Sequence, residues 1–228
     1  MGINYYSHVC FSGKMGSGKT TASEYLVNTY KYTRLSFAGA LKEIVNYLEK
    51  CGSPFLTTCY TAWNFGGLDV FTFFTFWQVL RETQLIPPEF PKPRRRLQFL
   101  GNSIRDRISK NFWVDIIQRK LRASQFDPKI KFVIDDARYP NEVQLLRAYN
   151  FLDVFIVCKD TTRLSRLKAL YGITDINDSR LYAESEVALD DFVFTVRLSN
   201  DLITHHSVPV VADFLNTIDD VLYTYKLI

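Results

Sequence analysis

A glycine-rich segment near the N-terminus carries residue types that bind phosphate groups. Residues 13–20 are Gly-Lys-Met-Gly-Ser-Gly-Lys-Thr, which fits the spacing G-x-x-x-x-G-K-[ST]. The glycines of such a loop let backbone N–H groups converge on phosphate oxygens at the positive end of the following helix. Lys19 is expected to reach the β- and γ-phosphates, and the Thr20 hydroxyl to bind Mg²⁺. The residues predicted to contact ATP are Gly13, Lys14, Gly16, Ser17, Gly18, Lys19, Thr20 and Thr21.

A carboxylate at the end of a neighbouring strand is needed to complete a magnesium site beside such a loop. Asp135 and Asp136 follow the apolar run Phe132-Val133-Ile134. One carboxylate would serve the metal ion and the other would face the phosphoryl acceptor. The alternative is that the pair caps a turn. We assign Asp135 to the metal together with Thr20, although the sequence does not distinguish the two aspartates in this role.

Several arginines are placed to neutralise the charge that phosphoryl transfer spreads over the migrating group. Arg138 follows the acidic pair at the same predicted edge of the sheet. Arg105 lies on a segment whose apolar residues recur every three or four positions, so one face is buried and the arginine points elsewhere. Arg163 and Arg166 lie three apart on a predicted helix that could close over the donor phosphates. For each arginine the alternative is a solvated helix face.

Short apolar runs alternate with helical patterns along the chain. The predicted strands are 8–12, 32–36, 131–135, 154–157 and 192–196, and the predicted helices are 20–30, 41–50, 162–171 and 208–225. Nearly continuous apolar strands separated by helices are typical of a parallel sheet that is covered on both faces. The predicted fold class is therefore α/β, with a central parallel sheet in a three-layer arrangement.

A long segment between the second and third predicted strands interrupts this alternation. Its most apolar part, residues 68–80, is shorter than the ~20 residues needed to span a bilayer. It predicts a buried helix or the wall of an apolar pocket. Core packing is the expected role of the aromatic residues in this region, with stacking on a base as the alternative. These residues are Tyr60, Trp63, Phe73 and Trp77.

Composition limits the class of protein. The 228 residues are 47% hydrophobic and 15% aromatic, which is enough apolar surface for one sizeable core and argues against disorder. A formal charge of +4 suits anionic ligands but is too small to indicate nucleic-acid binding. The four cysteines form no C-x-x-C pair and predict buried, reduced thiols. With no basic segment before an apolar run at the N-terminus, the predicted location is the cytoplasm, or the host cytoplasm if the chain is viral.

Several motifs occur in the order found in one kinase family. Besides the glycine-rich loop, they are Leu41-Lys42, residues 96–105 (Arg-Leu-Gln-Phe-Leu-Gly-Asn-Ser-Ile-Arg), residues 135–142 (Asp-Asp-Ala-Arg-Tyr-Pro-Asn-Glu), and the late pairs Ser185-Glu186 and Asn200-Asp201. From about Cys10 to Asp201 the chain resembles the deoxynucleoside monophosphate kinases of phage type. The resemblance implies a single P-loop kinase domain over residues 1–228. It also implies an acceptor-binding insertion over about 52–110 and a lid over about 160–186.

The resemblance further implies phosphorylation of a deoxynucleoside monophosphate to the diphosphate, with ATP and Mg²⁺ as cofactors. The resemblance is compatible with a homodimer and implies no binding to a membrane or to nucleic acid. The implied catalytic residues are Lys19, Asp135, Arg138, Arg163 and Arg166. The implied substrate-binding residues are Lys42, Gln98, Arg105, Asp136, Arg138 and Glu142.

Two other functions fit the same residues. One is a P-loop kinase of another small molecule, such as a dephospho-coenzyme A kinase. The other is a nucleotide-binding module without transfer, in which the basic run Arg94–Arg96 and the aromatic insertion form an interface. Acceptor-dependent release of ADP would distinguish a kinase from such a module, whereas salt-sensitive DNA binding without that release would favour the module.

Overall fold

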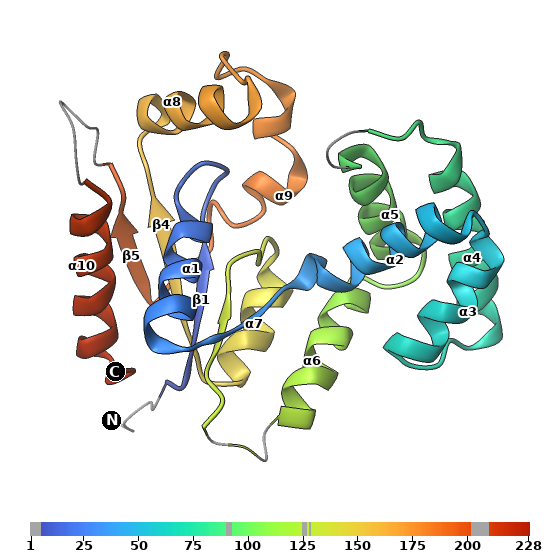
Figure 1. Cartoon of the computed structure of the whole chain (residues 1–228), viewed down its shortest axis with the longest axis horizontal. Coiled ribbons are helices and arrows are strands. Elements are labelled where there is room, and N and C mark those ends of the chain that lie inside the picture. The colour runs from blue at the N-terminus through green and yellow to red at the C-terminus, as the bar shows by residue number, and fades with distance from the viewer. Residues whose placement is uncertain (1–5, 90–92, 125–126, 128, 202–209) are drawn as a thin grey trace. The chain divides into compact units, whose positions relative to one another are not determined.

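The computed structural model describes residues 6–89, 93–124, 127, 129–201 and 210–228. The chain divides into two units, coloured by position along the chain in Figure 1. The first unit is formed by Met1–Leu35 and Ser124–Ile228, and the second by the continuous segment Ser36–Ala123. The predicted insertion, residues 52–110, lies entirely within the second unit.

A five-stranded parallel sheet forms the centre of the first unit. Its strands are β1 (His8–Ser12), β2 (Thr33–Leu35), β3 (Phe132–Ile134), β4 (Phe151–Val157) and β5 (Val196–Ser199). Their order is β2-β3-β1-β4-β5, and every neighbouring pair is parallel. The three central strands are rich in Val, Ile, Leu and Phe and are almost wholly buried, as expected where both faces of a parallel sheet are covered.

Helices cover both faces of this sheet (Figure 1). On one face, α1 (Lys19–Tyr30) and α10 (Val210–Thr224) share a buried cluster with β1 and β4. On the opposite face lies α7 (Pro140–Ala148), whose Arg147 forms an ion pair with Asp153 of β4. Asp153 alternates along β4 with residues of the first cluster and therefore points to the other side. The predicted three-layer α/β fold with a parallel sheet is confirmed.

Several element boundaries differ from the prediction: the helix predicted over 41–50 begins at Phe37, and β4 begins at Phe151 rather than at 154. The predicted strand 192–196 is wrong, because β5 begins only at Val196. The backbone N–H of Thr195 donates instead to the Asp153 carboxylate at 2.9 Å, and its hydroxyl donates to the same group at 2.8 Å. The last helix begins at Val210, and residues 208 and 209 of its predicted range lie outside the described residues.

The predicted lid segment follows β4 and is largely helical. It contains α8 (Asp160–Tyr171), the short 3₁₀ helix η1 (Ser179–Leu181) and α9 (Glu184–Val187). Leu167, Ile173 and Leu181 form a small buried cluster in it, against which Met15 of the glycine-rich loop packs. Segment 160–186 is therefore in contact with that loop.

Within its described residues, the second unit is built from five helices, namely α2 (Phe37–Cys51), α3 (Pro54–Phe65), α4 (Val70–Leu85), α5 (Arg94–Arg107) and most of α6 (Phe112–Ser124). They enclose a separate core that includes Ile44, Phe76 and Leu100. Local caps help to fix where α3 and α4 begin. The Ser53 hydroxyl accepts the N–H of Leu56, and the Asp69 carboxylate accepts that of Thr72.

The apolar helix α4 is only partly buried, which corrects the prediction for residues 68–80. Its residues Phe76, Val79 and Leu80 are buried, but Phe71 is 75% exposed and Phe74 is 56% exposed. An apolar run longer than one turn places side chains all around a helix, and only one face of α4 meets the core.

The aromatic residues of the insertion differ in burial. Trp63 is 88% exposed, so core packing was wrong for this residue. Tyr60 does pack, because its ring stacks on Tyr47 with centroids 4.1 Å apart. Phe73 and Trp77 are half-buried and both contact the Phe55 ring.

All four cysteines are free thiols, but they differ in burial. Cys10 is buried as predicted, Cys51 and Cys158 are half-buried, and Cys59 is exposed, contrary to the prediction. Within the described residues, no helix combines the length and apolar character needed to cross a bilayer.

His8 at the start of β1 gives the fold a pH dependence. Its ring lies between Phe132 and Phe151, and its Nδ1 accepts the N–H of Phe132 at 3.1 Å. Burial lowers the pKa of His8 from 6.5 to about 4, so the folded state favours the neutral ring. The stabilisation is complete above pH 6.5 and is lost as the pH falls through 4. After allowance for solvent screening it amounts to about 1–2 kcal/mol.

The variant His8→Asn tests this prediction, since its amide oxygen can accept the same N–H but does not titrate. Urea unfolding at pH 7, 5.5 and 4 should show a smaller loss of unfolding free energy with acidity in the variant than in the wild type. Equal pH dependence in the two proteins would show that His8 is not responsible.

Candidate active site

The glycine-rich loop joins β1 to α1, which is the position the sequence predicted. Gly13, Gly16 and Gly18 have φ of +144°, +81° and +104°, a region that side chains disfavour. A Cβ atom on Gly13 would lie 2.6 Å from the Ile156 carbonyl oxygen, and one on Gly18 would lie 2.3 Å from Asn200 Nδ2. The loop therefore needs glycine at these positions both for its backbone conformation and for its close approach to the sheet.

Alanine at Gly18 should disrupt the loop. The added Cβ would collide with Asn200, whose Nδ2 donates to the Ser17 carbonyl oxygen at 2.8 Å. We expect Gly18→Ala to weaken ADP binding by about tenfold or more and to cost about 1–3 kcal/mol of stability. Calorimetric titration with ADP and thermal unfolding measure the two effects.

Gly39→Ala is the matched control, because its Cβ would make ordinary contacts of 3.7 Å or more. ADP affinity unchanged by Gly18→Ala would contradict the role given to this backbone.

The Lys19 side chain folds back over the loop. Its Nζ donates to the carbonyl oxygens of Gly13 at 2.7 Å and Lys14 at 2.8 Å, and the residue is 8% exposed. Burial lowers the pKa of Lys19 to about 7, and the nearby Arg138 acts in the same direction, while the Glu186 carboxylate opposes it. A bound phosphate group would favour the charged ammonium form.

The other loop residues fit a phosphate ligand. Thr20 and Thr21 lie in the first turn of α1 and are exposed. The Ser17 hydroxyl is buried and has no hydrogen-bond partner within the described residues. It lines a pocket of about 260 Å³ together with Lys14, whose Nζ pairs with Asp190 at 3.0 Å. Glycines that leave no room for a Cβ, together with an unpaired buried hydroxyl, are consistent with a loop built to enclose an anion.

Asp135 follows β3 and is buried, as expected for a carboxylate at the end of a strand. Both of its oxygens accept hydrogen bonds from the Arg34 guanidinium of β2, at 3.1 and 2.5 Å. Because both carboxylate oxygens bind Arg34, the alternative that Asp135 caps a turn is wrong. Asp136 is half-buried and comes next in the chain.

Thr20 and Asp135 carry oxygen atoms of the hard type that Mg²⁺ prefers. The part of the chain that the structure describes contains no group of three or more His, Cys, Asp or Glu arranged for a metal. Magnesium in nucleotide sites commonly takes only one or two protein ligands and completes its shell with phosphate oxygens and water. These two residues therefore fit the chemistry of a nucleotide-bound Mg²⁺.

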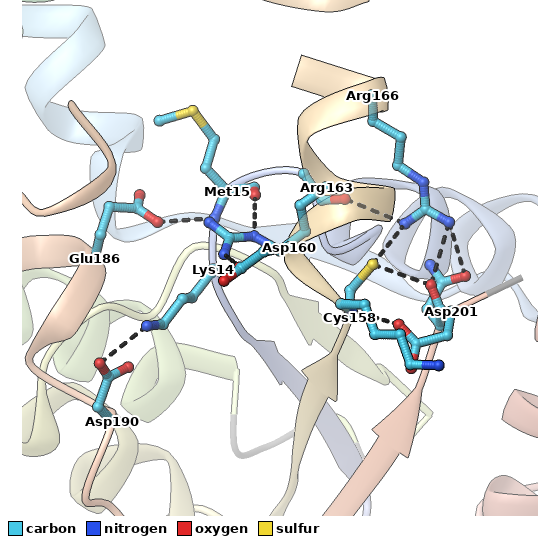
Figure 2. A network of polar contacts seen from close by, with 12 residues as sticks. Lys14, Met15, Cys158, Asp160, Arg163, Arg166, Glu186, Asp190 and Asp201 are labelled. Atoms are coloured by element: carbon cyan, nitrogen blue, oxygen red, sulfur yellow. Dashed lines mark hydrogen bonds and ion pairs between the residues drawn. The ribbon is translucent and has the colours of Figure 1, made fainter. Parts of the chain in front are cut away.

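Two arginines of α8 contact the glycine-rich loop (Figure 2). Arg163 is buried, and its Nε donates to the Met15 carbonyl oxygen at 3.0 Å while its Nη1 pairs with Asp160. Arg166 Nη1 donates to the Gly16 carbonyl oxygen at 3.2 Å. The alternative of a solvated helix face is thus wrong for Arg163. Both side chains lie at the loop, as the prediction for the donor phosphates requires.

Arg138 follows β3 and is held by two glutamates. Its Nη1 forms an ion pair with Glu186, and its backbone N–H donates to Glu142 at 2.6 Å. Glu142 also accepts the N–H of Tyr139 at 3.0 Å and so caps the beginning of α7. Glu142 thereby fixes the backbone that carries Arg138. A direct contact between Glu142 and the substrate stays a prediction.

The remaining predicted substrate residues belong to the second unit. Lys42 is exposed on α2, and Arg105 of α5 donates to the Lys110 carbonyl oxygen at 3.2 Å. Gln98 is exposed on α5 and lines an open pocket of about 630 Å³. Phe99, Asn102 and Asp106 line the same pocket, so one face of α5 offers it both an aromatic ring and polar groups.

The basic run Arg94–Arg96 does not act as one surface. Arg96 is buried, where its Nε donates to the Ile86 carbonyl oxygen at 2.8 Å and its Nη1 pairs with Glu49 at 3.1 Å. Arg95 pairs with Glu89. Arg96 thus ties helices of the second unit together.

Three residues at the site had no place among the predicted site residues. Glu186 and Asn200 lie in the late motifs that supported the resemblance, and these motifs were the signal that could have found them. Arg34 had no such signal. It is separated from Asp135 by 101 positions and lies on a three-residue edge strand.

Comparison with known proteins agrees with the motifs. No family model matches the chain. The chain is similar to the deoxynucleoside-5'-monophosphate kinase of Escherichia phage T5, with 26% identity over 183 residues, covering 62% of this chain and 72% of the phage protein. The predicted resemblance is confirmed. Among solved structures, the chain is also similar to a gluconokinase from Sinorhizobium meliloti 1021, with a TM-score of 0.47, 14% identity, and coverage of 96% of this chain and 97% of that chain.

Proposed function

We propose that this chain is a P-loop kinase that transfers the γ-phosphoryl group of ATP to the phosphate of a deoxynucleoside monophosphate. The observation that carries the transfer reaction is the gathering of Lys19, Arg138, Arg163 and Arg166 around one phosphate-binding loop. Similarity to the phage T5 enzyme supports the choice of acceptor.

The acceptor phosphate needs no dedicated general base. Its second pKa is about 6, so most of it is already a dianion at neutral pH. Catalysis then reduces to alignment of two anions, neutralisation of their charge and exclusion of water. Each of these tasks has a candidate among the described residues.

On the donor side, the backbone of residues 13–20 would hold the phosphate chain, and Lys19 would turn its Nζ from the loop carbonyls to the phosphate oxygens. Arg163 and Arg166 would offset charge that develops on the migrating group. Thr20 and Asp135 would hold Mg²⁺, which supplies further charge neutralisation when bound. Arg34 would keep the Asp135 carboxylate oriented.

On the acceptor side, Arg138 would bind the phosphate, with Asp136 nearby. The insertion over 52–110 would bind the nucleoside through Gln98 and Arg105, together with Lys42 of α2, and segment 160–186 would act as a lid that excludes water. ATP and Mg²⁺ are the proposed cofactors. A homodimer in the cytoplasm, or in the host cytoplasm if the chain is viral, completes the proposal.

Coupled measurement of ADP release tests this function directly. The acceptors are dTMP, dGMP, dCMP and dAMP, their ribose counterparts, and dephospho-coenzyme A. Stimulation by one or more deoxynucleotides is the expected result and would also identify the base preference. Stimulation by dephospho-coenzyme A alone would overturn the acceptor class. ATP binding without release of ADP for any acceptor would favour a binding module.

A further inference from the structure

One buried carboxylate joins three parts of the candidate site. Glu186 Oε2 accepts the backbone N–H of Met15, in the glycine-rich loop, at 2.8 Å, and Oε1 accepts a hydrogen bond from Arg138 Nη1. Glu186 is 8% exposed and lies on α9, within segment 160–186. Figure 2 shows its side chain pointing at Met15 from the chain beyond α8.

The ion pair leaves part of the Arg138 guanidinium available. The Glu186 side chain is 5% exposed and that of Arg138 is 27% exposed, so the pair is buried on the glutamate side and open on the arginine side. A guanidinium has five N–H donors in one plane, and Glu186 engages a single nitrogen. The other donors can bind a planar or tetrahedral anion such as a phosphate group.

Holding the arginine in place has a physical benefit. A free arginine side chain loses conformational freedom when it is fixed by a ligand, and this loss weakens binding. The contact with Glu186 meets much of that cost before the acceptor arrives. Because the same carboxylate binds the Met15 N–H, the arginine is fixed relative to the donor loop, and in-line transfer depends on that spacing.

We propose that Glu186 is a positioning residue, which sets the Arg138 guanidinium against the glycine-rich loop for the acceptor phosphate. The inference rests on the proposed kinase function and adds to it a residue that touches neither substrate. Its two oxygens have separate tasks, one for the loop and one for the arginine.

The variant Glu186→Gln tests the proposal, because a glutamine has a single acceptor oxygen and cannot serve both partners. With the acceptor found in the ADP-release assay, we expect kcat/KM for the acceptor to fall by about tenfold to a hundredfold. ADP affinity by calorimetry should change little. Glu186→Asp keeps the charge on a shorter side chain and should recover part of the loss. Glu184→Gln, an exposed change on the same short helix, is the matched control and should behave as the wild type.

A double-mutant cycle separates positioning from a general structural role. If Glu186 acts through Arg138, adding Glu186→Gln to Arg138→Ala should cause almost no further loss of acceptor kcat/KM. Additive losses, or equal losses of acceptor turnover and ADP affinity in Glu186→Gln, would overturn the proposal. An active wild type with an unimpaired Glu186→Gln variant would also overturn it while leaving the kinase function intact. A wild type inactive with every acceptor would remove the proposed function and this inference together.

Discussion

Replacing Lys19 with methionine is expected to lower kcat for phosphoryl transfer by about a thousandfold while the protein stays folded. Methionine keeps the length of the buried stem but removes the ammonium group, which now contacts the carbonyl oxygens of Gly13 and Lys14. The transferred phosphoryl group would then lack a positive charge that no neighbouring residue can supply from the same position.

Steady-state kinetics, with ADP affinity and thermal unfolding measured in parallel, check this expectation. Lys120→Met removes an ammonium group from an exposed position on α6 and is the matched control. A folded Lys19→Met protein with wild-type turnover would show that the glycine-rich loop is not the catalytic centre. If Lys19→Met loses both folding and turnover, Lys19→Arg would separate the two effects, because it retains the charge and should retain the fold.

The glycine-rich loop could be predicted from sequence because its geometry depends on residues close together in the chain. Spacing alone placed glycine where φ is positive, and the helix predicted over 20–30 begins one residue after the observed start of α1 at Lys19. The central strands were accessible in part, since β3 and residues 154–157 of β4 are continuous apolar runs and parallel sheets bury both faces, whereas Asp153 interrupts β4. Such signals are local, and local signals are what a single sequence contains.

The sequence predictions failed where a contact with a distant residue determines the local structure. Strand β5 begins late because the Thr195 N–H donates to Asp153, a residue 42 positions away. Helix α4 leaves Phe71 and Phe74 exposed because the core of the second unit meets only one of its faces. Neither the start of β5 nor the exposure of these phenylalanines can be inferred from apolar composition. The sequence shows the same residue type whether a phenylalanine is buried or exposed.

The charged residues of the site show the same difference between what local sequence signals reveal and what contacts with distant residues determine. The resemblance suggested that Asp135 and Arg138 matter, but not what holds them. Arg34 orients the first and Glu186 the second, across 101 and 48 positions of sequence respectively. These two candidate catalytic side chains are therefore each paired with a distant residue of opposite charge. A sequence identifies the charges, whereas their pairing requires the fold.

The pairing of Arg138 leads to the second large effect. Arg138→Ala should lower kcat/KM for the acceptor by about a hundredfold to ten-thousandfold, with little change in KM for ATP, because the guanidinium faces the acceptor phosphate in the proposed reaction. Alanine also leaves the buried Glu186 carboxylate without its partner, which could cost about 3–5 kcal/mol of stability. Thermal unfolding must therefore accompany the kinetics.

Arg138→Lys separates these two consequences. Lysine can keep an ion pair with Glu186 and should restore most of the stability, but it lacks the planar group that binds two partners at once, so acceptor turnover should stay low. Arg180→Lys, at an exposed arginine that pairs with Asp178, is the matched control. Rates measured with ATP varied at saturating acceptor, and then with the acceptor varied at saturating ATP, assign the defect to one side. A loss confined to ATP would place Arg138 with the donor phosphates, and the acceptor phosphate would then need another cation among the predicted substrate residues, for which Lys42 and Arg105 are the candidates.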